Sequence, residues 1–88
     1  MRNTMVKNGV YRHFKGGEVL VFGIAKTPED GVDVLYLGMQ NGKIYSRPIE
    51  SFLDEAKNSD GAIVNRFVLE KEITNIDLVN FLEGFKNN

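Results

Sequence analysis

The stretch VDVLYLGMQNGKIYSRP, residues 32–48, decides the fold of this 88-residue chain. It places two runs of strand-forming residues on either side of Asn41-Gly42. Asn-Gly is the strongest short signal for a β-hairpin, because both central residues of the tight turn must tolerate positive φ. With a two-residue loop, Tyr36 faces Arg47 across the hairpin. The predicted antiparallel strands are residues 34–40 and 43–47.

Alternation along this hairpin sorts its side chains into two faces. The apolar face, which we expect to form the core, holds Leu35, Leu37, Met39 and Ile44. The other face, which we expect to be a solvent-exposed aromatic and basic surface, holds Tyr36, Gln40, Lys43, Tyr45 and Arg47. Gly38 leaves space beside the Tyr45 ring.

A second hairpin is predicted upstream, in GVYRHFKGGEVLVFGIA, residues 9–25. Its double glycine permits a tight turn, but the sequence leaves the loop length open, and the loop length decides which side chains share a face. A two-residue loop would place Tyr11 and His13 beside Leu20. A three-residue loop with a bulge would place them beside Val19, and we favour this arrangement.

Two helices and one more strand are predicted downstream. After Pro48, apolar residues recur at helical spacing and predict a helix over residues 48–57. AIVNRFVLE, residues 62–70, alternates as a last strand would. ITNIDLVNFLEGF has a helix cap at Thr74 and predicts a helix over residues 74–85. Its apolar stripe, which needs the sheet or a second copy as a partner, is Leu78, Phe81, Leu82 and Phe85.

These elements predict one mainly β (α+β) domain, residues 1–88. We expect a small, strongly bent antiparallel sheet resembling an SH3-like barrel over residues 9–70, with a short helix before the last strand and the C-terminal helix packed outside. The hydrophobic fraction of 42 % suffices for one core. The net charge of −1 and the pI of 5.8 argue against bulk nucleic-acid binding. No apolar run approaches the ~20 residues of a membrane span, so we expect a soluble cytoplasmic protein without membrane contact.

The chemistry-bearing residues form no catalytic or ligand-holding pattern. His13 is the only histidine and cysteine is absent, which leaves no metal-ligand spacing. No nucleophile motif or glycine-rich phosphate loop is present. We therefore expect no catalytic residue, metal or cofactor, and a hydrogen-bonded structural role for His13. The alternative is a small enzyme or ligand sensor that uses His13 in a pocket.

The stronger functional candidate is a binding face that combines aromatic rings with basic groups. Such a face can stack on or hydrogen-bond an extended partner, although cross-strand pairing alone would also explain it. We expect a non-catalytic binding module for a protein or peptide, with a short nucleic-acid segment or a homodimer through the C-terminal helix as other options. The candidate face is Tyr11, His13, Lys15, Tyr36, Tyr45 and Arg47.

The order of these motifs is similar to the bacterial family called domain of unknown function 1653. That family's pattern has Gly-x-Tyr-x-His-x-Lys-Gly, a Val-x-Gly-x-Ala strand, an aromatic-x-Arg-Pro-x-x-x-Phe segment and a final Arg-Phe. The resemblance covers residues 9–67, and the chain departs from it at Leu20 and Phe22 and in the added helix. It implies a fold and a candidate surface, but no reaction. The matching residues are Tyr11, His13, Lys15, Gly16, Val21, Gly23, Ala25, Tyr45, Arg47, Pro48, Phe52, Arg66 and Phe67.

Overall fold

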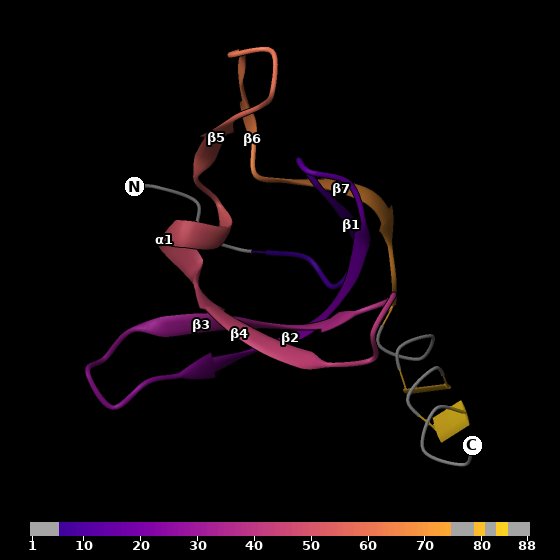
Figure 1. Ribbon diagram of the computed structural model, residues 1–88. Coiled ribbons are helices and arrows are strands. Elements are labelled where there is room, and N and C mark those ends of the chain that lie inside the picture. Colours follow the sequence, from indigo (N-terminus) through magenta and orange to yellow (C-terminus); the bar gives the residue numbers. More distant parts are fainter. Residues whose placement is uncertain (1–5, 75–78, 81–82, 85–88) are drawn as a thin grey trace.

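The computed structural model describes residues 6–74, 79–80 and 83–84 of the chain, and the described part is mainly β (Figure 1). None of its helices is long and apolar enough to cross a membrane. The elements are β1 (Gly9–His13), β2 (Glu18–Lys26), β3 (Val32–Gly38), β4 (Ile44–Pro48), α1 (Ile49–Phe52), β5 (Glu55–Lys57), β6 (Ile63–Asn65) and β7 (Phe67–Glu72).

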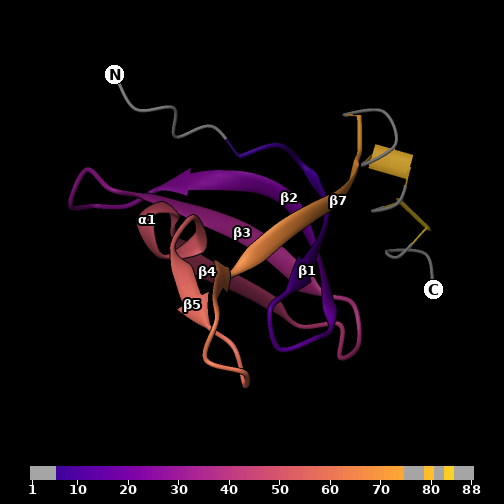
Figure 2. The same cartoon turned by 90° about the horizontal axis from the view of Figure 1, so that it is seen from above.

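Five strands form one antiparallel sheet in the order β4-β3-β2-β1-β7. The sheet bends around α1, and β5 and β6 project from it as a separate two-stranded hairpin (Figures 1 and 2). The pairing register shifts between Val10 and Tyr11 and again between Val21 and Gly23, and such irregularities bend a sheet locally. The described strands do not close into a barrel, because β4 and β7 remain its two edges.

The first hairpin has the three-residue loop that we favoured. Tyr11 pairs with Val19, and the His13 N–H donates to the Gly17 carbonyl at 3.0 Å across the turn. Gly16 and Gly17 both have φ near +90° (92° and 87°), which explains the double glycine. Tyr11 and Val19 therefore share one face.

The second hairpin is antiparallel as predicted, but its register is shifted by two residues. Tyr36 pairs with Tyr45 rather than Arg47, and the loop spans residues 39–42. The side chain of Asn41 explains the longer loop: its Oδ1 accepts from the Lys43 N–H at 3.0 Å and its Nδ2 donates to the Tyr45 hydroxyl at 2.8 Å. Because the shift is even, Tyr36, Tyr45 and Arg47 still lie on one face.

That aromatic face is the inside of the bent sheet, which reverses part of our prediction. Tyr36 is only 7 % exposed, whereas Ile44 and Met39 of the expected core face are 66 % and 44 % exposed. Leu37 is buried, but in a second, smaller cluster with Leu20. The main core comprises Tyr11, Val21, Val34, Tyr36, Ile49, Phe52 and Phe67. The prediction was wrong because it weighed hydropathy along the hairpin alone, while aromatic residues from α1 and β7 cover the other face.

The helix after Pro48 is shorter than predicted, and Ala56 and Lys57 belong to β5 instead. The predicted last strand divides at Arg66, whose N–H donates to the Asp54 carbonyl at 3.0 Å. This bond ties the start of β7 to the end of the α1 segment. All four residues of the predicted C-terminal stripe lie outside the described residues.

The burial of the aromatic core predicts that alanine substitutions at two adjacent residues differ strongly in their effect on stability. Phe52 is 2 % exposed and Leu53 is 44 % exposed. Phe52→Ala should lower the free energy of unfolding by about 3–5 kcal/mol, whereas Leu53→Ala should change it by about 0.5 kcal/mol or less. Urea denaturation followed by circular dichroism measures both. Equal losses for the two variants would contradict this description of the core.

Candidate functional site

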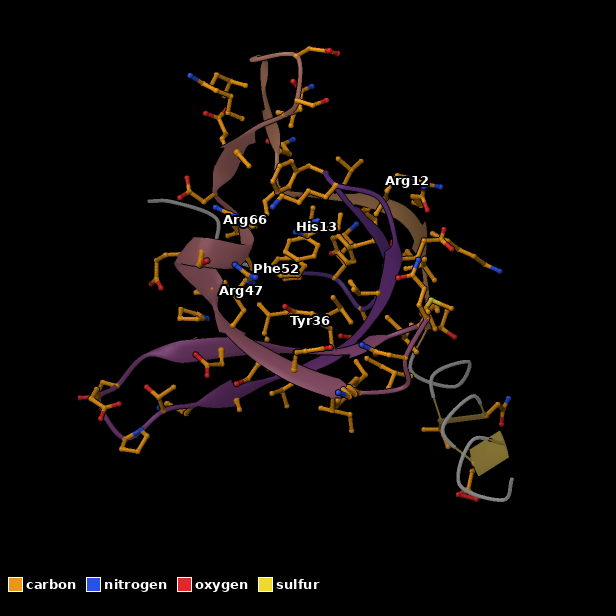
Figure 3. The ribbon with its side chains drawn as sticks, in the orientation of Figure 1. Arg12, His13, Tyr36, Arg47, Phe52 and Arg66 are labelled. Carbon is orange, nitrogen blue, oxygen red and sulfur yellow. The ribbon has the colours of Figure 1, made fainter. Side chains whose placement is uncertain are left out.

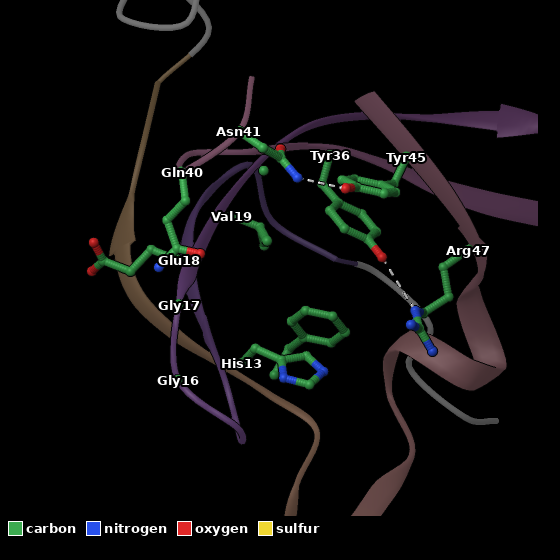
Figure 4. A pocket seen from close by; sticks show the side chains of 12 residues that line it. His13, Gly16, Gly17, Glu18, Val19, Tyr36, Gln40, Asn41, Tyr45 and Arg47 are labelled. Atoms are coloured by element: carbon green, nitrogen blue, oxygen red, sulfur yellow. Dashed lines mark hydrogen bonds between the residues drawn. The ribbon is translucent and has the colours of Figure 1, made fainter. Parts of the chain in front are cut away.

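Four of the six residues of the candidate face line one cavity on the inside of the bent sheet (Figure 4). They are His13, Tyr36, Tyr45 and Arg47. The cavity measures about 280 Å³ and lies between the β1–β2 turn, the β3–β4 loop, β4 and the start of β7. The other lining residues are Gly16, Gly17, Glu18, Val19, Gly38, Gln40, Asn41 and Phe67.

The remaining two residues of the candidate face do not line this cavity. Tyr11 is a core residue: its ring meets the Phe52 ring edge-on at a centroid distance of 5.2 Å, and its hydroxyl donates to the Lys7 carbonyl at 2.7 Å. Burial raises the pKa of Tyr11 above its usual value. Lys15 is exposed on the β1–β2 turn, where its ammonium lies 5.7 Å from the centre of the Phe14 ring.

The floor of the cavity is Phe67, which also belongs to the core. Its ring stacks on Phe52 at a centroid distance of 4.3 Å and an interplanar angle of 7°. The His13 ring meets it edge-on at 5.0 Å, and the Tyr36 ring lies 5.7 Å away. Sequence reasoning placed Phe67 in the last predicted strand but not in the candidate face. The Arg-Phe pair in the family pattern was the one signal that connected it to the site.

Arg47 is held in place without an ion pair. Its Nε donates to the Tyr36 hydroxyl at 3.3 Å, and its Nη1 donates to the Ser51 hydroxyl at 3.0 Å. The guanidinium carbon lies 5.6 Å from the centre of the Phe67 ring, within range of a cation–π interaction. Within the described residues no carboxylate lies at ion-pair distance from Arg47.

His13 points into the cavity in a defined tautomer. Its Nδ1 accepts a hydrogen bond from the Lys15 N–H at 3.2 Å, so the neutral imidazole carries its proton on Nε2. The pKa of His13 is lowered, first by burial and then by the positive charges of Arg47, Arg66 and Lys15. The imidazole is therefore a neutral hydrogen-bond donor at neutral pH.

Two stacked tyrosine rings and an amide form another wall of the cavity. The rings of Tyr36 and Tyr45 stack at 5.6 Å, and Asn41 holds the Tyr45 hydroxyl. A Cβ atom at Gly38 would lie 2.7 Å from Asn41 Oδ1 and 3.2 Å from the Tyr45 ring, which confirms that Gly38 makes room for this ring. The amide of Gln40 similarly lies against Gly17, where a Cβ atom would be 3.1 Å away.

Glu18 is the one acidic residue that lines the cavity, and its carboxylate points away from the cavity (Figure 4). This carboxylate lies 3.7 Å from Arg12 Nη2. Arg12 also donates from Nε to Glu70 at 2.7 Å, on the outside of the sheet (Figure 3). Hydrogen bonding to Glu70 raises the pKa of Glu18, and the same bond lowers that of Glu70. The groups that face the cavity are consequently neutral or positive.

The described residues contain no group of three or more His, Cys, Asp or Glu side chains that could hold a metal ion. The cavity lining includes one imidazole and no serine, threonine, cysteine or lysine. Its chemistry is therefore stacking, hydrogen-bond donation and attraction of negative charge.

Comparison with known proteins gives a family and a related structure. The family model described as "Protein of unknown function (DUF1653)" matches residues 9–69. The crystal structure of a DUF1653 protein from Bordetella bronchiseptica has a TM-score of 0.68 with this chain at 27 % sequence identity, and the match covers 78 % of this chain and 92 % of that one. No curated protein matches the sequence.

The single histidine makes its environment directly measurable. By NMR, His13 should titrate with a midpoint below 6.5, and Arg47→Gln should raise that midpoint. Because the unfolded chain then binds more protons than the folded one, the free energy of unfolding should fall as the pH falls from about 7 to the folded pKa. A midpoint at or above 6.5 would contradict the positive surroundings described above.

Proposed function

Because this chain belongs to the DUF1653 family of proteins of unknown function, we propose a function from its cavity: a non-catalytic binding module that receives one group of a protein or peptide partner. The observation that carries the proposal is the convergence of His13, Tyr36, Tyr45 and Arg47 on one cavity. These side chains come from β1, β3 and β4, so only the folded sheet assembles them.

The geometry supports binding because the polar groups are positioned before a partner arrives. Tyr36 and Ser51 fix the Arg47 guanidinium, and Asn41 fixes the Tyr45 ring. Held side chains lose little conformational entropy on binding, so more of the contact energy appears as affinity. Tyr45 remains 40 % exposed and offers surface for stacking.

A peptide fits this cavity better than a nucleic acid. A nucleic-acid surface requires a row of basic groups along the backbone path, whereas only one arginine lines the cavity and the pI of the chain is 5.8. The open bent sheet, which we compare with the small SH3-like barrels, leaves room for an extended chain across the rim. A cytoplasmic location remains our expectation for this module.

One observation favours a second candidate, a small-ligand sensor or enzyme that uses His13. The imidazole lines the cavity, and its Nε2 has no hydrogen-bond partner among the described residues. The Nε2–H of an imidazole in this position can donate a hydrogen bond or a proton to a bound ligand. No other lining residue offers a nucleophile to accompany it.

A peptide-display selection against the immobilised full chain tests the binding module. We expect enriched peptides whose affinity falls at least tenfold with Tyr45→Ala or Arg47→Gln, the loss typical of a central contact residue. Fluorescence anisotropy with the selected peptides measures the affinities, and circular dichroism confirms the fold of each variant.

Lys26→Gln is the matched control for Arg47→Gln. It removes one positive charge at the far end of β2, where Lys26 is exposed, and should leave the affinity unchanged. Selected peptides that bind a folded Tyr45→Ala, Arg47→Gln double variant as tightly as the parent would refute the proposal.

A further inference from the structure

We propose, on the basis of the binding function above, that the group entering the cavity is a carboxylate of an acidic peptide, held by Arg47 and His13 beside a flat group that stacks on Tyr45. The carboxylate belongs either to the peptide C-terminus or to an Asp or Glu side chain. Both sources present the same planar anion.

Positive charges at the cavity that have no carboxylate partner among the described residues indicate that the ligand is an anion. Arg47 faces the cavity without a carboxylate partner in the described part of the chain, and Glu18 is engaged with Arg12 outside the sheet. Arg66 adds a second positive charge close to His13, and its Nε is buried without a hydrogen bond. Figure 3 shows Arg47, Arg66 and His13 gathered inside the bend. An opposite charge brought by a ligand would stabilise these partly buried guanidinium groups.

The donor geometry selects a planar anion. Two guanidinium N–H groups of Arg47 are used by Tyr36 and Ser51, and the remaining ones are left for a ligand. The Nε2–H of His13, which lies on β1, is a further donor to the same cavity. A guanidinium fork matches the two oxygens of a carboxylate, and such charge-assisted bonds are among the stronger ones in proteins.

Size and charge argue for a carboxylate over a phosphate-bearing nucleotide. The cavity of about 280 Å³ is slightly smaller than typical small-molecule sites, whose volumes span roughly 300–1,000 Å³. It can take one side chain or chain terminus. One guanidinium and a neutral imidazole line it, a donor set that suits a monoanion better than a dianion.

Three small probes test the inference on the unmodified full chain, so the result does not depend on how variants fold. They are phenylacetate, its neutral analogue phenylacetamide, and phenyl phosphate, added at constant ionic strength and followed by ¹H–¹⁵N NMR. We expect phenylacetate to shift the amide signals of Gly17 and Gly38 saturably and phenylacetamide to bind at least tenfold more weakly. Phenylacetate should also raise the His13 pKa, because its charge offsets those of Arg47, Arg66 and Lys15.

Variants and peptides then locate the contact and its source. Arg47→Gln should weaken phenylacetate at least tenfold, and Lys26→Gln should not. For a selected peptide, loss of binding on C-terminal amidation assigns the terminal carboxylate, whereas loss on replacing its Glu or Asp with the amide assigns a side chain.

Three outcomes would overturn the carboxylate inference. Equal binding of phenylacetamide would leave the cavity as a binding site without selection for charge. Tighter binding of phenyl phosphate by tenfold or more would assign a phosphate instead. No response to any probe would also overturn it, and the peptide selection, which uses no assumption about charge, would still decide the binding function separately.

Discussion

The stacked rings of Phe52 and Phe67 are the contact on which the rest of this structure depends. Phe52 ends the single turn of α1 and Phe67 begins β7, so their contact joins two segments between which the projecting β5–β6 hairpin lies in the sequence. Tyr11 and Tyr36 pack against the same pair from β1 and β3. Four separate segments therefore meet at one aromatic cluster, and the sheet bends around it.

The same cluster links stability to the site, because Phe67 is both a core residue and the floor of the cavity. Of the other three rings that line the cavity, Tyr36 and His13 contact Phe67 directly. Two arginines on the two sides of the bent sheet have different surroundings. Arg12 is paired with carboxylates on the outside, while the partners of Arg47 on the inside, within the described part of the chain, are two hydroxyls and an aromatic ring.

Sequence reasoning identified the strands of the first two hairpins, β1 to β4, but missed β5 and merged β6 with β7. It also placed Tyr36, Tyr45 and Arg47 on a shared face, because alternation survives a register shift of two residues. It failed on which face is buried. Leucine and isoleucine rank above tyrosine in hydropathy, yet the covering rings come from residues distant in the chain, which local patterns do not reveal. It also overextended the helix, because the spacing of Ala56 fits both a helix and the short strand that it joins. The convergence of His13 with Arg47 depends on the bend, and no local pattern encodes it.

The position of β1 inside the sheet has a consequence for the order of folding. β1 lies between β2, which follows it after a three-residue turn, and β7, which lies beyond every other strand in the chain. The β1–β2 and β3–β4 hairpins close short loops and can form early. The β1–β7 pairing closes a long loop, so its loss of chain entropy on closure is larger. Phe67, which forms the floor of the cavity, is the first residue of β7. We therefore expect the cavity to be completed late in folding, when β7 pairs with β1; until then one edge of β1 has unpaired backbone groups that a second chain can engage.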